Sequence, residues 1–205
     1  MTKIEQRFGS LDFNDLFNKS VDNSELRIII MQLVVENSLW VDPYVYDKIQ
    51  VVFPKTKRRS GKQKRGEVDE EGNTIWNNEP AKWAFWNALG LNYNGLKNSY
   101  ICHIYGGSVT KPEHFTNLAN MVALPRAIQS LSEWPPINDI LKYRSYEIFH
   151  YNGPEKGLPS KPDLYEHIIF KKTNTNNDEL NDIIEKLKKW RSNKPDYLHW
   201  LSEKQ

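Results

Sequence analysis

The spacing of apolar residues predicts helices in the first half of the chain. Apolar side chains recur every three or four positions at 11–18 and again at 24–37, where Ser24 is a suitable capping residue. The segment 44–53 is apolar without a clear period, so a short helix and a strand both remain open there. Two helical segments therefore come first, followed by one short element of undecided type.

Later segments show the same helical period. Residues 80–89 begin with Pro80, which suits the first turn of a helix, and end before a glycine. Residues 177–190 place apolar side chains on a single stripe, which is typical of a surface helix packed on a core. A short final helix is expected at 195–201.

A different pattern occupies the middle of the chain. Residues 100–105 and 121–124 are short apolar runs typical of strands. The segment 125–133 begins with a proline and is expected to be a helix that the Pro135–Pro136 pair stops. We therefore predict an α+β fold, mainly helical, with an embedded β-β-α unit.

These elements divide the chain into four segments. They are a helical region at 1–53, a loop or hairpin at 54–78, a core with the β-β-α unit at 79–136, and a mixed and helical region at 137–205.

Composition narrows the class of protein. Of 205 residues, 39% are hydrophobic, which indicates a folded chain. No apolar run approaches the roughly 18 residues of a membrane span, and the first residues lack the apolar core of a secretion signal. One cysteine excludes an internal disulfide and a zinc site built on several cysteines. A cytoplasmic protein without a membrane partner is expected.

Charge is concentrated in one segment, although the net charge is only +2. Acidic residues at 67–71 follow directly on a basic run. Clustered basic side chains neutralise phosphates and release counterions, which makes this run a candidate DNA-contacting arm. A solvated surface loop has the same composition, and charge alone does not separate the two. The basic residues are Lys55, Lys57, Arg58, Arg59, Lys62, Lys64 and Arg65.

The strongest candidate for catalysis is His103, which lies late in the first predicted strand. A histidine with a near-neutral pKa can take a proton from water at physiological pH. Asn120 stands just before the second strand, where its amide can orient the imidazole. An orienting group is needed because one ring nitrogen accepts a proton only when the other carries one.

These residues carry a family resemblance. The run CHI, then Gly106-Gly107, then NLAN and ALPRAIQ resembles the signature of HNH (ββα-metal) endonucleases, over residues 100–133. The resemblance implies that His103 is the general base and that Asn120, or less readily Asn117, supports it and the intervening loop. It also implies a divalent metal, Mg²⁺ or Mn²⁺. The metal positions fall on Cys102 and near Gln129, with His114 as an additional ligand.

The resemblance further implies an endodeoxyribonuclease acting on double-stranded DNA. So small a catalytic unit needs other elements to read a sequence, and the remainder of the chain is long enough to supply them. We therefore expect a type II restriction-like enzyme that works as a homodimer on a symmetric site. Lys111 and Arg126 flank the site in the sequence and are candidate phosphate contacts.

Two alternatives remain open. One is a phage or mobile-element HNH enzyme that nicks longer, asymmetric targets. The other is a non-catalytic nucleic-acid-binding protein with a decayed HNH unit, because a thiol and an amide are poor ligands for magnesium. The chain has no phosphate-binding GxxxxGK[ST] loop and no GxSxG nucleophile elbow, which excludes those two classes of site.

Overall fold

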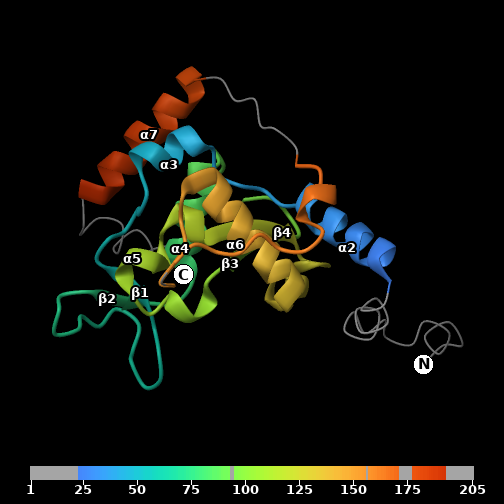
Figure 1. Ribbon diagram of the computed structural model, residues 1–205. Helices are drawn as coiled ribbons and strands as arrows, with labels where there is room; N and C mark the ends of the chain where they lie inside the picture. Colours follow the sequence, from blue (N-terminus) through green and yellow to red (C-terminus); the bar gives the residue numbers. More distant parts are fainter. Residues whose placement is uncertain (1–22, 93–94, 156, 171–176, 193–205) are drawn as a thin grey trace, which may run out of the picture.

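The computed structural model describes residues 23–92, 95–155, 157–170 and 177–192, which form helices around two small sheets (Figure 1). This mixed α/β architecture is consistent with the expected α+β class. The helices predicted at 11–18 and 195–201 lie outside the described residues. The helices and strands are α2 (Ser24–Glu36), α3 (Pro43–Lys48), β1 (Thr56–Arg58), β2 (Thr74–Trp76), α4 (Glu79–Ala88), β3 (Ser99–His103), α5 (Pro112–Phe115), β4 (Met121–Pro125), α6 (Pro135–Phe149) and α7 (Asn177–Ser192). Short 3-10 helices are η1 (Gly106–Ser108), η2 (Leu118–Asn120), η3 (Gln129–Glu133) and η4 (Tyr165–His167).

The helix predicted at 24–37 is confirmed as α2, but its capping residue is Asn23, one residue earlier than expected. The side-chain oxygen of Asn23 accepts a hydrogen bond from the backbone N–H of Leu26 at 3.1 Å, so Ser24 is the first helical residue. The undecided segment begins as helix α3, because Asp42 accepts from the backbone N–H of Tyr44 at 2.8 Å. Local capping thus decides where both helices begin.

The two predicted strands of the central unit are confirmed as an antiparallel pair, β3 and β4. His103 lies opposite Met121, and Ser99 lies opposite Pro125. The seventeen residues between them hold η1, α5 and η2 and form the loop that returns the chain to the sheet. This pairing places His103 at the end of the sheet where that loop begins.

The helix predicted at 125–133 is wrong. Pro125 ends β4, and η3 is the helical element within the residues that follow. Pro135, which was expected to stop a helix, instead begins α6. A proline fixes φ and lacks an N–H, and both properties suit the first turn of a helix as well as the end of the preceding one. The segment after β4 is therefore a tight connection and not the helix of a ββα unit.

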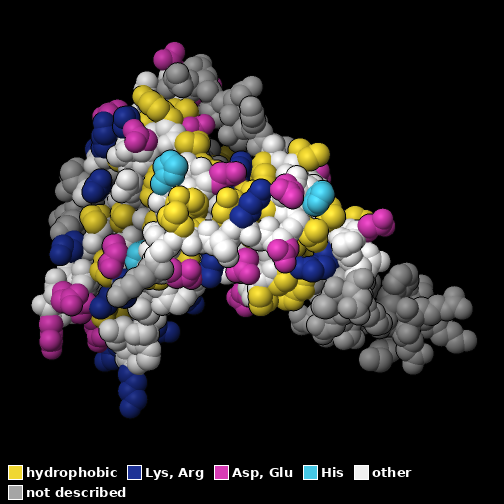
Figure 2. Space-filling view, viewed as in Figure 1, with side chains coloured by type: hydrophobic (Ala, Val, Ile, Leu, Met, Phe, Trp, Pro, Cys, Tyr) yellow, Lys and Arg dark blue, Asp and Glu magenta, His cyan; other side chains and the backbone are white. Residues whose placement is uncertain are grey.

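The segment 54–78, predicted as a loop or hairpin, contains a parallel pair of strands and also an isolated antiparallel bridge between Val68 and Thr74. Thr56 of β1 lies opposite Thr74 of β2, and the strands run in the same direction. The chain between them forms two loops that extend away from the helices (Figure 1). In Figure 2 one of these projections ends in basic side chains and the other in acidic ones.

A single hydrophobic cluster joins the described elements. It runs from Ile30 in α2 to Leu187 in α7 and includes β4 and most of α4. The ring of Trp83 in α4 stacks on Trp190 of α7 with centroids 3.5 Å apart, and on Phe53 at 5.6 Å. The apolar stripe predicted for α7 is buried, as expected for a helix on the core. None of the described helices is long and apolar enough to cross a membrane.

Gly153 shows how tightly the chain after α6 packs on the central loop. Its φ is +62°, and a Cβ atom there would lie 2.6 Å from the ring of Tyr105. Gly61 has a similar φ of +55°, but a Cβ atom at that position would meet nothing within 4 Å. The two glycines therefore share a backbone requirement and differ in packing.

We expect Gly153→Ala to destabilise the protein by about 1 kcal/mol from the left-handed backbone and by about 1–3 kcal/mol more from overpacking. Gly61→Ala should lose only the stability that comes from the left-handed backbone, about 1 kcal/mol. Urea unfolding of the two variants and the wild type measures both. Equal losses of stability in the two variants would contradict the close packing of Gly153 on Tyr105.

Candidate functional site

His103 is held in one orientation by the loop between β3 and β4. Its Nε2 lies 3.0 Å from the backbone oxygen of Phe115, and its ring stacks on the Phe115 ring at 5.9 Å. A carbonyl only accepts, so Nε2 carries the proton and donates. Nδ1 is then the nitrogen with a lone pair, and it makes no hydrogen bond to another described residue.

The surroundings of His103 keep its imidazole neutral. Burial lowers its pKa from the ordinary 6.5 to about 4, against the opposing effect of the Phe115 carbonyl. The positive charge of Arg58, at the end of β1, lowers it further. At neutral pH His103 is therefore a proton acceptor with a fixed tautomer, and an arginine of the basic segment is close enough to act on it.

Asn120 braces the loop that orients His103. Its side chain is fully buried, and its oxygen accepts a hydrogen bond from the backbone N–H of Tyr105 at 2.8 Å. Its amide nitrogen donates to the backbone oxygen of His114 at 2.9 Å and to the hydroxyl of Ser108 at 3.4 Å. Asn120 thus joins both ends of the loop, although its side chain forms no hydrogen bond with the His103 ring. The Asn117 oxygen accepts from the backbone N–H of Ala119 at 3.0 Å, and its side chain also hydrogen-bonds Tyr46 of α3.

The predicted metal residues do not converge. Cys102 follows the pleat of β3 to the face opposite His103, where its sulfur lies 4.0 Å from the backbone oxygen of Gln129. Burial raises the pKa of this thiol, so it stays protonated and is a poor ligand. The Nδ1 of His114 lies 2.8 Å from the hydroxyl of Tyr151 and is already engaged. Among the described residues, no three His, Cys, Asp or Glu side chains are grouped so that they could hold an ion.

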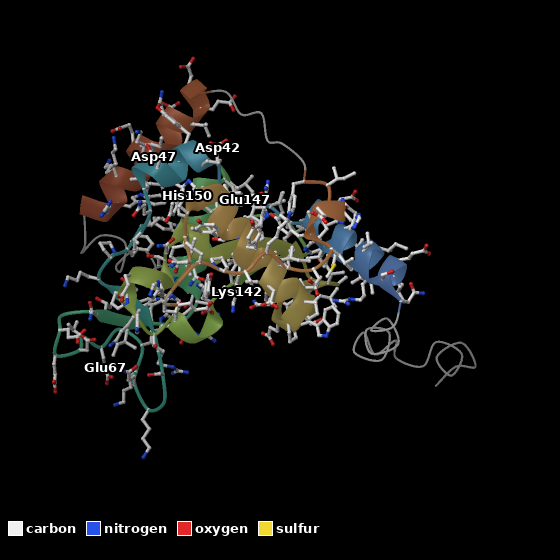
Figure 3. The ribbon with its side chains drawn as sticks, in the orientation of Figure 1. Asp42, Asp47, Glu67, Lys142, Glu147 and His150 are labelled. Carbon is white, nitrogen blue, oxygen red and sulfur yellow. The ribbon has the colours of Figure 1, made fainter. Side chains whose placement is uncertain are left out.

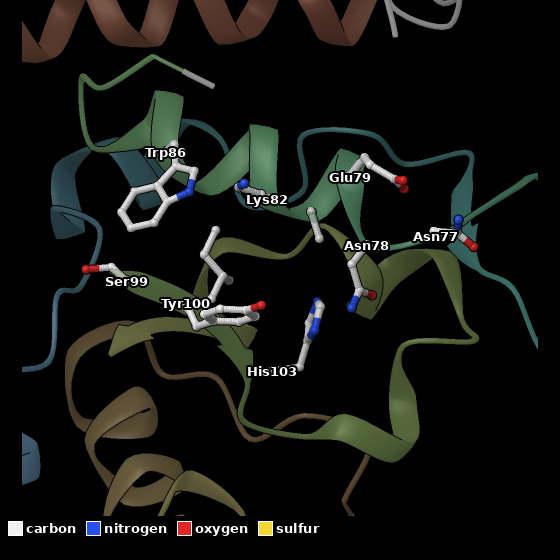
Figure 4. Close-up of a pocket in the computed structure, with 10 residues that line it drawn as sticks. Asn77, Asn78, Glu79, Lys82, Trp86, Ser99, Tyr100 and His103 are labelled. Carbon is white, nitrogen blue, oxygen red and sulfur yellow. The ribbon is translucent and has the colours of Figure 1, made fainter. Parts of the chain in front are cut away.

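His103 projects into a pocket between β3 and α4, which we call the α4–β3 pocket (Figure 4). Its volume is about 470 Å³. The side chains on its wall include Asn78, Glu79, Lys82, Trp86, Ser99 and His103. Of these, the sequence analysis identified His103 alone. The missed signal is the spacing of Glu79, Lys82 and Trp86, which places all three on one face of a helix.

His103 also borders a second hollow, of about 520 Å³, on the side of the central loop. Lys111 lines this hollow together with Lys142 of α6, which is labelled in Figure 3. Lys142 forms an ion pair with Glu155 at 2.9 Å. Lys111 is exposed, as expected for a phosphate contact, whereas Lys142 is already paired.

The basic segment is only partly available for a ligand. Lys57 forms an ion pair with Asp69 at 2.5 Å, and this contact lowers the pKa of the Asp69 carboxyl well below its usual range. The guanidinium of Arg65 lies over the ring of Trp76 at 4.5 Å. The other five predicted DNA contacts in this segment are exposed, namely Lys55, Arg58, Arg59, Lys62 and Lys64. Arg126 is exposed too, with its guanidinium 5.8 Å from the ring of Tyr100.

The lowered pKa of His103 predicts a loss of stability in acid. Between pH 6.5 and about 4 the unfolded chain binds a proton that the folded chain does not, so stability falls as the pH falls through that window. We expect His103 to contribute a loss on the order of 2 kcal/mol between pH 7 and pH 5. Urea unfolding at both pH values should show a smaller loss in His103→Gln. An NMR titration that places the pKa of His103 near 6.5 would contradict this.

Removal of the Asn120 amide should unfold the loop or weaken it severely. Asn120→Ala leaves the Tyr105 N–H and the His114 carbonyl without their partner in the interior, at a cost of about 3 kcal/mol or more. Asn152→Ala is the matched control, because its amide donates to the backbone oxygen of Gly157 at an exposed site. Urea unfolding should show a loss under about 1 kcal/mol for the control. Similar losses in both variants would disprove the bracing role.

No family model, no curated protein and no solved structure matches the chain. The functional assignment therefore depends on the residues around His103.

Proposed function

We propose that the protein is an endonuclease that hydrolyses phosphodiester bonds of double-stranded DNA with His103 as the general base. The observation that carries this proposal is the hydrogen bond from His103 Nε2 to the backbone oxygen of Phe115. This bond commits Nδ1 to accept a proton, and the imidazole projects into the α4–β3 pocket (Figure 4). A base with a fixed tautomer beside a pocket is the arrangement that water activation needs.

The chemistry would proceed at the phosphate bound beside His103. Nδ1 takes a proton from water as the water oxygen attacks phosphorus, and the departing oxygen takes a proton from solvent. The negative charge of the phosphate raises the pKa of the neighbouring imidazole, which brings the base closer to the range in which it works at neutral pH. Arg58 supplies positive charge at the same place, since its charge already acts on the imidazole.

The exposed part of the basic segment supports DNA as the substrate. Arg58 and Arg59 begin the loop that leaves β1, and Lys62 and Lys64 continue it away from the helices. Cationic side chains in this arrangement neutralise successive phosphates along a backbone. The acidic projection beside it, which includes Glu70 and Glu71, repels the same backbone and limits the orientations that DNA can take. Lys111 and Arg126 add exposed positive charge near the hairpin.

Cleavage of both strands at a symmetric site would require two copies of the chain, one for each strand. We therefore propose a homodimeric, restriction-type enzyme that depends on Mg²⁺ or Mn²⁺, as the resemblance to HNH endonucleases implies. The predicted donors do not converge, so the residues that would hold the ion are other than Cys102, His114 and Gln129 acting together. An enzyme that nicks one strand of a longer target is the alternative within the same chemistry.

One observation favours a second function. A protonated Cys102 on the far face of β3 and an engaged His114 are what a decayed metal site would show. The chain would then be a nucleic-acid-binding protein that uses the basic segment without cleavage. The two functions differ in whether removal of His103 has any effect beyond binding.

The decisive experiment is incubation of purified protein with supercoiled plasmid and Mg²⁺ or Mn²⁺. We expect discrete linear or nicked products, and a rate at least about 100-fold lower for His103→Ala because the base is lost. The matched control is His167→Ala, which removes an exposed histidine of η4 and should cleave like the wild type. Circular dichroism confirms that both variants are folded.

The other outcomes identify which assignment fails. Undiminished cleavage by His103→Ala would show that the base is misassigned. A smear of fragments would replace restriction with non-specific cleavage. DNA binding by the wild type without cleavage in either metal would establish the binding protein in place of the nuclease.

A further inference from the structure

The α4–β3 pocket is built from two rows of side chains that face each other. Glu79, Lys82 and Trp86 lie three and four residues apart on one face of α4, and Ser99 and His103 lie on one face of β3. Asn78 and His103 stand together at the start of α4, whereas Trp86 and Ser99 lie toward the other end (Figure 4). The pocket is therefore elongated, with chemically different ends.

Two buried atoms on its wall have no hydrogen-bond partner in the protein. The indole nitrogen of Trp86 is a donor on a residue that is only 1% exposed, and the Oε2 of Glu79 is an acceptor. An unpaired buried polar atom costs about 1–3 kcal/mol, which a bound partner would recover. Figure 4 shows the nitrogen-bearing edge of Trp86 turned toward the interior of the pocket. Both atoms are covered by neighbouring protein atoms, so a ligand in the pocket reaches them only when its binding shifts the side chains around them. Such a ligand brings a hydrogen-bond acceptor to Trp86 and a donor to Glu79.

The lining of the pocket selects the class of ligand. Its volume of about 470 Å³ falls within the range of small-molecule sites, and Ile101 and Tyr100 add apolar and aromatic surface to the polar groups. Lys82 adds a cation to the α4 wall, whereas the Glu79 carboxylate in the first turn of α4 offsets the positive potential of that helix end. An aromatic ring that carries both acceptors and donors, attached to an anion, is the structure of a nucleotide.

We infer that the α4–β3 pocket binds one unstacked nucleotide of the substrate. The base lies at the Trp86 end, with a ring oxygen or nitrogen accepting from the indole N–H. The phosphate lies at the His103 end, and Glu79 accepts from an amino or hydroxyl group of the same nucleotide. The position of the phosphate rests on the proposed function, but the base site rests on Trp86 and Glu79 alone.

A base bound in this pocket sets a requirement on the substrate. A base inside a stacked duplex cannot enter a pocket between a helix and a strand, so the nucleotide must leave the stack first. Unstacking costs a few kcal/mol in a paired duplex and less at a mismatch or in a single strand. We therefore expect cleavage to be faster where one base beside the scissile phosphate is already unpaired.

The test follows the Trp86 indole N–H signal by NMR on addition of deoxynucleoside 5′-monophosphates. Deoxyribose 5-phosphate and inorganic phosphate are the matched controls, because they lack the base. We expect a shift of this signal with at least one mononucleotide and none with either control. Trp86→Phe, which keeps an aromatic ring but removes the donor, should weaken mononucleotide binding about five- to tenfold, the loss of one hydrogen bond.

Should Trp86→Phe fail to fold, Ser99→Phe tests the same pocket from the strand side. It narrows the pocket without entering the core, and it should abolish the mononucleotide-dependent shift. A shift that is equal with deoxyribose 5-phosphate, or absent with all four mononucleotides, would overturn the base site. A pocket that holds only water would give no shift with any of the four mononucleotides.

The two proposals fail in different ways. Mononucleotide binding by a protein that never cleaves DNA would overturn the nuclease and leave the base site standing. Cleavage that depends on His103 but is indifferent to Trp86→Phe and to a mismatch beside the cut would overturn the base site and leave the nuclease standing.

Discussion

The buried amide of Asn120 is the constraint on which the site depends. Its three hydrogen bonds join Tyr105, just after β3, to Ser108 and His114 farther along the loop. The loop so fixed presents the Phe115 carbonyl to His103. Without that carbonyl the imidazole could adopt either tautomer and several rotamers. The single asparagine therefore helps to orient a histidine to which it makes no hydrogen bond.

The β3–β4 pair and the loop between its strands are bonded to the remainder of the molecule. Leu39 and Ala123 form an isolated antiparallel bridge, and Val51 and Asn117 form a second, so the chain before β1 is tied to β4 and the loop. On the side of α6, Ser145 donates to the backbone oxygen of Ala119 at 2.7 Å. These contacts place rigid elements around the loop. The two loops between β1 and β2 project from this rigid body.

The sequence was sufficient for features that depend on local pattern. His103 and Asn120 could be placed because a short apolar strand, a glycine turn and an asparagine before a second strand are readable in order. The proline at 135 was misread, because the same residue can end one helix or begin another, and the choice depends on packing after β4. The parallel pairing of Thr56 with Thr74 is non-local and has no signature in so short a strand.

The α4–β3 pocket was missed for a related reason. Trp83 and Trp86 both fall within the helix predicted at 80–89, and Trp83 lies in the core between Phe53 and Trp190. Trp86 is as buried, but it shares its face with Glu79 and Lys82, and a helix face that combines an indole with two charges is unusual for a pure core contact. The helical spacing was visible in the sequence. What the sequence did not show was that β3, which begins eleven residues after α4 ends, lies against this face of the helix.

Burial favours the neutral form of both His103 and Cys102, the neighbouring residues of β3, and this has different chemical consequences for the two. It lowers the pKa of His103 and raises that of Cys102, so both side chains are neutral. For an imidazole the neutral form is the proton acceptor, whereas for a thiol it is the form that neither attacks nor binds metal well. Neither His103 nor Cys102 therefore carries a charge. In the proposed enzyme, positive charge for a phosphodiester would come from Arg58, Lys82 and Lys111, which lie on β1, on α4 and directly before α5.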